Sequence, residues 1–293
     1  MVSTVAGTFR AARREGAARA WYAFSRNSTS VAGLLIVVLV VLWTAFAPWL
    51  TPFPRHARAF TDIEHANQPP GLPYLFGTDT IGRDIFTRVI FGYRFSLLLG
   101  VVVLSLAVPV GVALGLAAGY FRGWPETVIM RVTDVFLSIP PLALALAIMA
   151  VLEPNLQNAM LAVSVMWWPW YTRLVYSLVS SLRQEAYVQA AEVVGASPAH
   201  ILLRELLPNC MPAILTKMTL DMAFVILIGS SLSYLGLGVQ PPDPDLGTMV
   251  ADGAKYMPDL WWISVFPGLA ILVIVLGFNL FGDGLRDVFG VEV

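Results

Sequence analysis

Six stretches of mostly apolar residues divide the chain, and polar segments separate them. They cover residues 31–50, 95–119, 127–152, 158–180, 212–235 and 261–282. Each has about the 20 residues that an α-helix needs to cross the hydrocarbon core of a bilayer. No small-residue cleavage site follows the first stretch, so we expect an uncleaved anchor. The pattern predicts an all-α, polytopic membrane protein with six transmembrane helices.

The composition supports this class and excludes several others. Of the 293 residues, 57% are hydrophobic and 13% are charged, against roughly 45–50% and 25% in soluble proteins. The net charge of −1 provides no basic surface for nucleic acid. One cysteine and three scattered histidines form no metal-binding pattern. The sequence contains no P-loop, so we expect no cofactor in this chain, and ATP would have to bind to another one.

Lysine and arginine near the span ends predict the orientation. With the N-terminus in the cytoplasm, twelve of the 18 lysines and arginines lie inside and six outside, which favours N-in and C-in. The predicted organisation is a basic cytoplasmic segment (1–30), the first anchor (31–50), an extracytoplasmic loop (51–94), a transmembrane core (95–285) and a cytoplasmic tail (286–293).

The first extracytoplasmic loop ends in a periodic stretch. Ile85, Phe86, Val89 and Ile90 recur at helical spacing, and Thr80 could cap a helix before them. We interpret this stretch as an amphipathic helix on the membrane surface. The alternative is a simple lead-in to the second span.

The loop between the fourth and fifth spans, residues 183–208, predicts two short helices. Helix-forming residues precede Gly195, which suits the left-handed position after a helix. Ser197 and Pro198 suit the N-cap and first position of the next helix, and Pro208 would end it. The loop is either a docking helix for a soluble partner or an amphipathic segment on the lipid headgroups.

Small and ring-closed residues mark packing and bends within the spans. Three glycines at four-residue spacing in the second span permit close helix contact or merely fill a lipid-facing helix: Gly111, Gly115 and Gly119. Pro140, Pro141 and Pro169 interrupt helical hydrogen bonding, as hinges or as bends.

Polar residues within the spans are candidates for the translocation pathway. Asp221 lies inside the fifth span, where it would pair within the bundle or line the pore. Asp134 and Arg131, near the inner end of the third span, could pair with each other or with groups of the loop 183–208. Asn279 suits a hydrogen bond between helices.

Several tracts resemble the shorter permease subunit of dipeptide/oligopeptide/nickel-type ABC importers. Gln189-Ala190-Ala191-x-x-x-Gly195, followed by Leu207-Pro208, is similar to their E-A-A-x-x-x-G loop, with glutamine in place of the first glutamate. The other tracts are Gly77-Thr78-Asp79, Gly82-Arg83-Asp84, Tyr234-Leu235-Gly236-Leu237-Gly238, Pro241-Pro242, Trp261-Trp262, Pro267-Gly268 and Gly282-Asp283-Gly284-Leu285-Arg286-Asp287.

This resemblance implies a subunit of the cell inner membrane that forms half of a pore. A related permease would complete the pore, two ATP-binding subunits inside would carry ATP and Mg²⁺, and a solute-binding protein would dock outside. The residues implied to couple to an ATPase are Glu185, Gln189, Ala190, Ala191, Glu192, Gly195, Ala196, Ser197, Leu207 and Pro208. Those implied to face the binding protein are Asp79, Arg83, Asp84, Asp243 and Asp245.

The resemblance makes di- or oligopeptides the expected solute. Relatives of this type also carry nickel chelates, opines, glutathione-like compounds and oligosaccharides, so these stay open. A stand-alone secondary transporter would instead show inverted repeats. A membrane-embedded hydrolase or transferase would need an activated nucleophile, but no histidine lies in any predicted span beside Ser230, Ser231 or Ser233.

Overall fold

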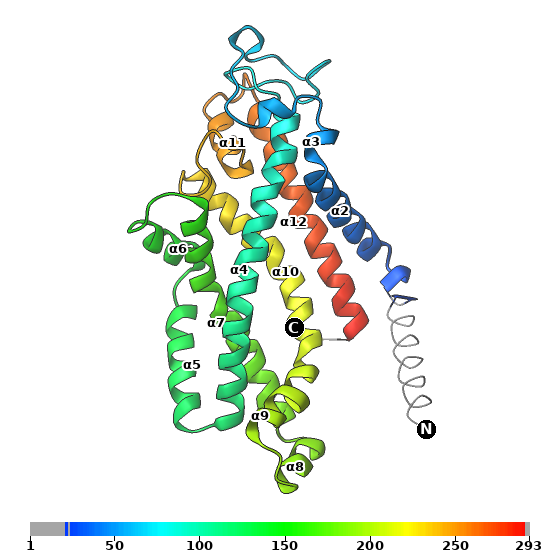
Figure 1. The fold of residues 1–293 in the computed structure, drawn as a ribbon, viewed down its shortest axis with the longest axis vertical. Coiled ribbons are helices and arrows are strands. Elements are labelled where there is room, and N and C mark those ends of the chain that lie inside the picture. Colours follow the sequence, from blue (N-terminus) through cyan, green and yellow to red (C-terminus); the bar gives the residue numbers. More distant parts are fainter. Residues whose placement is uncertain (1–20, 23, 291–293) are drawn as a thin grey trace.

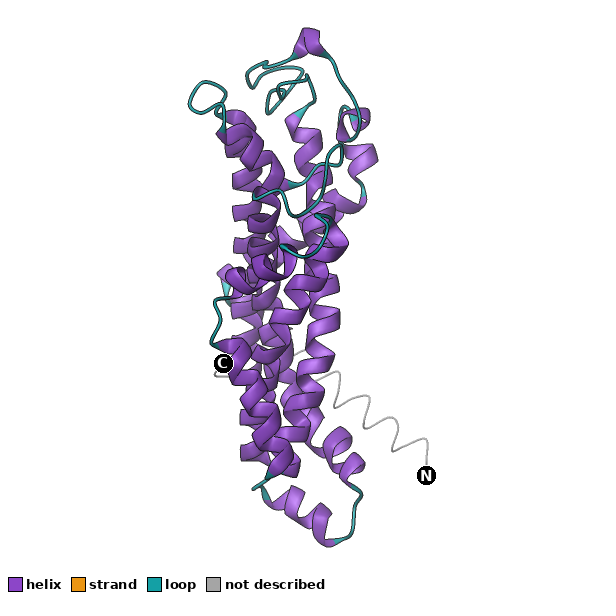
Figure 2. Cartoon of the chain, turned by 90° about the vertical axis from the view of Figure 1, so that its left-hand side faces the viewer, coloured by secondary structure: helices purple, strands orange, loops and turns teal. Residues whose placement is uncertain are grey.

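The computed structural model describes residues 21, 22 and 24–290, and within these residues it contains helices and no β-strand. The long helices run side by side along one axis, with connecting segments at both ends (Figures 1 and 2). They are α2 (Ser28–Ala45), α4 (Ile85–Phe121), α5 (Trp124–Leu137), α7 (Leu156–Leu182), α10 (Leu207–Tyr234) and α12 (Trp262–Phe289). Shorter helices are α3 (Ala47–Leu50), η1 (Pro54–Ala57), η2 (Ile63–His65), α6 (Pro141–Met149), α8 (Ala186–Val193), α9 (Pro198–His200), η3 (Ile201–Leu206) and α11 (Leu246–Ala254).

The structure supports a membrane-type helical fold with four or five candidate spans. α2, α4, the continuous helix Pro198–Tyr234 and α12 are each long and apolar enough, and α5 with α6 counts as a fifth. α7 has 27 residues, about 40 Å of helix. It is too polar to qualify, because it carries three tryptophans, two tyrosines and Arg173. Six spans and the N-in, C-in orientation therefore stay predictions. Most of the basic segment 1–30 lies outside the described residues.

α4 and α7 pack with their backbones in contact. A Cβ atom added to Gly111 would lie 2.5 Å from the carbonyl oxygen of Trp168, and one added to Gly115 or Gly119 would lie 2.7 Å from a valine Cβ of α7. The Thr172 hydroxyl donates across this contact to the carbonyl oxygen of Gly111 at 3.2 Å. All three glycines are buried, so they lie between two helices and do not face lipid.

The predicted prolines have different effects on the third and fourth apolar stretches. The chain bends by 87° between α5 and α6, where Pro140 and Pro141 leave their nitrogens without hydrogen atoms. Pro169 lies inside α7, which continues through it for several turns on either side. The predicted interruption is therefore confirmed in the third stretch, whereas the fourth forms one helix.

The separate amphipathic helix predicted before the second span is wrong. Residues 85–94 are the first turns of α4 itself, and Ile85, Val89 and Ile90 are buried inside the bundle. The cap is Asp84, whose carboxylate accepts from the backbone N–H of Thr87 at 2.8 Å, and not Thr80. α4 begins after this cap and continues without a break to Phe121. The periodic stretch and the second span therefore form one helix, as in the alternative of a lead-in to the span.

We predict that Gly115→Ala destabilises the protein, because the new methyl group would overlap Val175. The expected loss is about 1–3 kcal/mol in the free energy of unfolding, measured by thermal unfolding in detergent. Gly268→Ala in α12 is the matched control, since its Cβ would come no closer than 3.9 Å to Val250. Alanine favours helix by up to about 1 kcal/mol over glycine, so the control should be neutral or more stable. Equal stability of the two variants would contradict the close contact of α4 and α7.

Candidate functional site

The predicted functional residues gather at three levels of the bundle. The segment 183–208, here called the elbow, projects from one end with α8 at its tip (Figure 1). The loops that contain Asp79 and Asp243 lie at the opposite end with α11, and Asp221 lies within α10 between the two ends.

The elbow has the local structure that its residues dictate. Gly195 ends the turn after α8 with φ at +80°, a conformation that side chains with a Cβ rarely adopt. The Ser197 hydroxyl accepts from the backbone N–H of His200 at 3.3 Å, and Pro198 is the first helical residue. The predicted turn and cap are thus confirmed in geometry.

The tip of the elbow exposes apolar side chains. Val193 and Val194 are 87% and 81% exposed, while Val188 is fully buried and anchors α8. The predicted coupling residues at the surface are Glu185, Gln189, Ala190, Glu192, Gly195, Ser197 and Pro208; Ala191, Ala196 and Leu207 are half-buried. Exposed apolar groups surrounded by polar ones are typical of a protein–protein contact.

The second helix of the elbow does not end at Pro208, contrary to the prediction. α9 continues through the π-helical turn η3 into α10, so that one helix runs from Pro198 to Tyr234. In the π-helical turn the N–H of Leu207 reaches back five residues to the carbonyl oxygen of Leu202. This wider turn accommodates the ring of Pro208. The elbow is therefore joined to α10 without a flexible linker.

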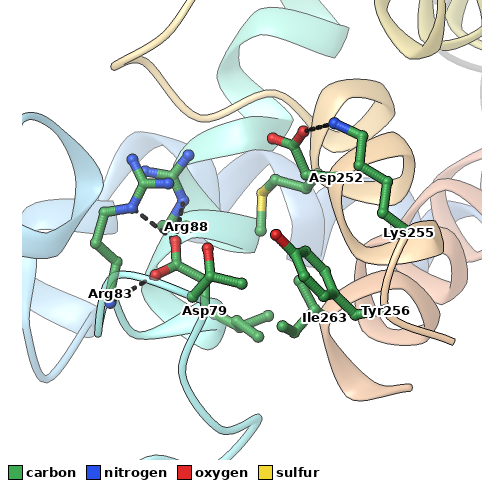
Figure 3. A pocket seen from close by; sticks show the side chains of 10 residues that line it. Asp79, Arg83, Arg88, Asp252, Lys255, Tyr256 and Ile263 are labelled. Carbon is green, nitrogen blue, oxygen red and sulfur yellow. Dashed lines mark hydrogen bonds and ion pairs between the residues drawn. The ribbon is translucent and has the colours of Figure 1, made fainter. Parts of the chain in front are cut away.

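A polar pocket of about 170 Å³ lies at the opposite end, and we call it the Arg88 pocket. Arg83 and Arg88 lie on one side next to Asp79, and the Asp252–Lys255 ion pair lies on the other with Tyr256 beside it (Figure 3). Arg83 Nε is 2.6 Å from Asp79 Oδ2, and Lys255 Nζ is 2.9 Å from Asp252 Oδ1. Arg88 went unnoticed in the sequence because its place in the pocket depends on α11.

Three of the residues expected to face a binding protein are buried instead: Asp79, Asp84 and Asp245. Asp84 and Asp245 cap α4 and α11, and their carboxylates accept from Thr87 and Thr248 backbone N–H groups. Burial raises the pKa of both carboxyl groups, although these hydrogen bonds act in the opposite direction. Their role in the structure is helix capping. Arg83 and Asp243 are half-buried at the surface.

Asp221 is buried and paired. Its Oδ2 accepts from the Trp167 indole at 3.0 Å, and its Oδ1 lies 3.1 Å from Lys217 Nζ. The Lys217 ammonium also lies 5.6–5.8 Å from the ring centres of Tyr171 and Trp170. Lys217 is four residues before Asp221 on α10, a spacing that the sequence alone could have indicated. A pocket of about 310 Å³ opens beside this pair.

The other two pathway candidates have different surroundings. Asp134 pairs with Arg173 of α7, and not with Arg131 as expected, because α5 packs against α7. Both side chains of this pair are about half exposed. Asn279 is half-buried in α12, and within the described residues its side chain makes no hydrogen bond. The predicted interhelical hydrogen bond of Asn279 is therefore not formed in the part of the chain that the structure describes.

We predict that Asp221→Asn destabilises the chain, because it leaves the Lys217 ammonium without its carboxylate. Breaking a buried ion pair costs roughly 3–5 kcal/mol; the partial exposure of Lys217 favours the lower end of this range. The double variant Lys217→Met/Asp221→Asn should recover most of the loss, as measured by thermal unfolding of the purified protein. If both variants lose equal stability, the pair is not the source of the effect.

We also predict that acid destabilises the loop that holds Asp84. His56 Nδ1 accepts from the Asp84 backbone N–H at 3.0 Å. Burial lowers the pKa of His56 below its ordinary 6.5, against the opposing effect of nearby carboxylates. The unfolded chain therefore binds this proton more readily, and stability falls as the pH drops below about 6.5.

The test of this acid effect is unfolding between about pH 7.5 and pH 5.5. The variant His56→Asn keeps an acceptor but cannot titrate, and its stability should depend less on pH. The His56 charge also lowers the pKa of Asp84, against the raising effect of burial, so the comparison measures His56 together with its effect on that carboxyl group. An identical pH dependence would contradict the role of His56.

Comparison with known proteins matches two parts of the chain to families of transport proteins. Residues 111–290 match the family described as binding-protein-dependent transport system inner membrane component. Residues 17–70 match the N-terminal transmembrane domain of oligopeptide transport permease C.

Individual relatives cover nearly the whole chain. The chain is 41% identical over 275 residues, 94% of its length and 91% of the relative's, to the "Probable D,D-dipeptide transport system permease protein DdpC" of Escherichia coli K12. It is 40% identical to the dipeptide transport system permease protein DppC of Alkalihalophilus pseudofirmus, covering 89% of this chain and 85% of that one.

Among solved structures, one chain of the MetNI methionine ABC transporter in an inward-facing conformation aligns with a TM-score of 0.55. The alignment covers 70% of this chain and 97% of that one at 18% identity. At this identity the likeness concerns the fold alone.

Proposed function

The chain belongs to the family of binding-protein-dependent transport system inner membrane components, and on that premise we propose that it forms half of the translocation pathway of a peptide importer. The observation that supports this most strongly is the exposed elbow, which continues without a break into α10. A transport subunit needs such a link, because energy must reach the pathway from outside this chain.

The solute that we propose is a di- or oligopeptide. The two relatives named above are a D,D-dipeptide and a dipeptide permease by name, and each aligns over most of its length. The solute would reach the chain from an external binding protein at the end that holds the Arg88 pocket. Six spans across the inner membrane, with both termini in the cytoplasm, are part of this proposal.

We propose that a related permease subunit forms the other half of the pore and that two separate subunits hydrolyse ATP. The sequence contains no P-loop, so ATP and Mg²⁺ are assigned to those partners. The valines at the elbow tip would enter a groove on an ATPase, with Glu185 and Glu192 at the rim. This chain would then act by shifting between two conformations, and it would contribute no chemical step.

The mechanism that we propose passes through α10. A push on α8 reaches Pro198 through the short turn at Gly195, and the continuous helix transmits it to the level of Asp221. The Trp167 hydrogen bond and the Lys217 ion pair connect this level of α10 to α7 and to its own preceding turn. Coupling would then consist of a change in how α10 packs against its neighbours.

The proposal predicts that Gly195→Val uncouples ATP hydrolysis from uptake. Valine disfavours a φ of +80°, and no atom lies within 4 Å of the new Cβ, so the strain acts on the backbone alone. In the reconstituted transporter, peptide uptake per ATP hydrolysed should fall about tenfold, which corresponds to roughly 1.4 kcal/mol of coupling.

Two controls accompany this test. Gly195→Asn should transport nearly normally, because asparagine tolerates the left-handed region. The amount of Gly195→Val chain in the membrane should equal that of the original, so that failed insertion is excluded. Normal uptake by Gly195→Val would contradict the proposed role of the elbow.

A further inference from the structure

The charges of the Arg88 pocket do not balance. Three cationic side chains and two carboxylates line it. Asp79 is satisfied by Arg83 and by two backbone N–H groups that donate to its Oδ1. Asp252 is paired with Lys255. These pairs account for both carboxylates, so the guanidinium of Arg88 is left over.

Arg88 is nevertheless the most deeply buried cation of the pocket, with 5% of its surface exposed. Its Nε lies 3.9 Å from Asp79 Oδ2, an oxygen that already accepts from Arg83. Its Nη1 lies 3.5 Å from the carbonyl oxygen of Pro242. Both distances exceed the 2.7–3.2 Å range of ordinary N–H···O hydrogen bonds. A group with five donors therefore makes only two long polar contacts within the described residues.

Burying a charge without a close counter-ion is strongly unfavourable. No nearby carboxylate supplies a close counter-ion: Asp79 and Asp252 are already paired, and Asp243, whose charge also acts on Arg88, forms no ion pair with it. We therefore propose that the Arg88 pocket binds the carboxylate of an organic acid, with the Arg88 guanidinium as its counter-ion. A planar guanidinium matches a carboxylate through two parallel hydrogen bonds.

The rest of the pocket fits such a ligand. The Tyr256 hydroxyl lies between the arginine side and the Asp252–Lys255 pair, where it can donate to a second oxygen (Figure 3). Ile85, Met249 and Ile263 line the pocket with apolar surface for the carbon atoms next to the carboxylate. The volume of about 170 Å³ is below the roughly 300–1,000 Å³ of pockets that enclose drug-sized molecules. It therefore admits the end of a larger molecule or a small acid.

Two sources of this carboxylate follow from the proposed function, on which their identification rests. One is the C-terminal carboxylate of a peptide that enters the pathway. The other is an acidic side chain of the protein that delivers it. The chemistry at Arg88 is the same for both, and the experiment separates them.

The first measurement is the unfolding midpoint of the assembled transporter with increasing sodium acetate, against sodium chloride at equal ionic strength. A ligand that binds only the folded state raises this midpoint in a saturable way. Arg88→Met should weaken the acetate affinity by about tenfold to a hundredfold, the value of a hydrogen-bonded charge. Lys255→Gln removes the same charge from the same pocket and should change the affinity less than about threefold, since Lys255 is already paired.

The acetate-free proteins provide an independent readout. Arg88→Met should unfold at the same temperature as the original or higher, because it removes a charge that lacks a close partner. The proposal is overturned if acetate has no effect beyond chloride on the original protein. It is also overturned if Arg88→Met keeps the original acetate response.

Further arms identify the source. Stabilisation by dialanine but not by its C-terminal amide assigns the site to the peptide carboxylate. If dialanine and its amide change the unfolding midpoint equally, and the purified binding protein binds Arg88→Met more weakly than the original, the site is assigned to a protein carboxylate. If the original transporter imports no peptide, the proposed function fails, whereas the acetate measurement still decides whether the pocket binds a carboxylate.

Discussion

The close contact between α4 and α7 is the interaction on which the other sites depend. Because Gly111, Gly115 and Gly119 lack side chains, the two backbones touch, and dispersion contacts and hydrogen bonds hold them without help from the hydrophobic effect of water. This contact fixes the position of α7. The Trp167 indole of α7 then donates a hydrogen bond to Asp221 of α10. Asp221 in turn keeps Lys217 beside the aromatic rings of α7. Separating α4 from α7 would therefore also disturb the Lys217–Asp221 ion pair of α10 and its link to the elbow.

The features that were predictable from the sequence are those decided by neighbouring residues. Gly195 and Ser197 act on atoms within a few positions, so their turn and cap follow from composition alone. Pro208 failed as a stop signal because the π-helical turn before it depends on packing of Ile201 and Leu206, which are fully buried. Thr80 failed as a cap because the chain turns at residues 80–82, with the φ of Gly82 at +83°, and the helix begins only after Asp84. The charge imbalance at Arg88 was not predictable, since it requires α11 to be placed against α4.

α7 lies where the sequence predicts the fourth span, but its polar residues make it too polar to count as a span by composition. α7 packs against α4, α5, α6 and α10, and its face toward these helices needs no apolar surface toward lipid, so polar aromatic side chains are tolerated there. Tyr171 and Val175 are fully buried, and Arg173 finds Asp134 on α5. A count of apolar residues detects helices that face lipid, so it can miss a membrane helix that packs mainly against other helices. Two of its polar side chains contact neighbouring helices, since Arg173 pairs with Asp134 on α5 and the Trp167 indole donates to Asp221 on α10.

The two ends of the molecule are connected by the same helix. α11 packs so closely on the outer part of α10 that a Cβ on Gly247 would overlap the carbonyl oxygen of Ser230. Asp252 and Lys255 follow on this segment and form one side of the Arg88 pocket, whereas Arg88 belongs to α4 and forms the other. A shift of α10 against α4 would therefore change the width of the pocket. By thermodynamic reciprocity, a carboxylate that prefers one width would bias α10 as much as the elbow biases carboxylate binding. The solute side and the ATPase side would then communicate through one helix that both of them move.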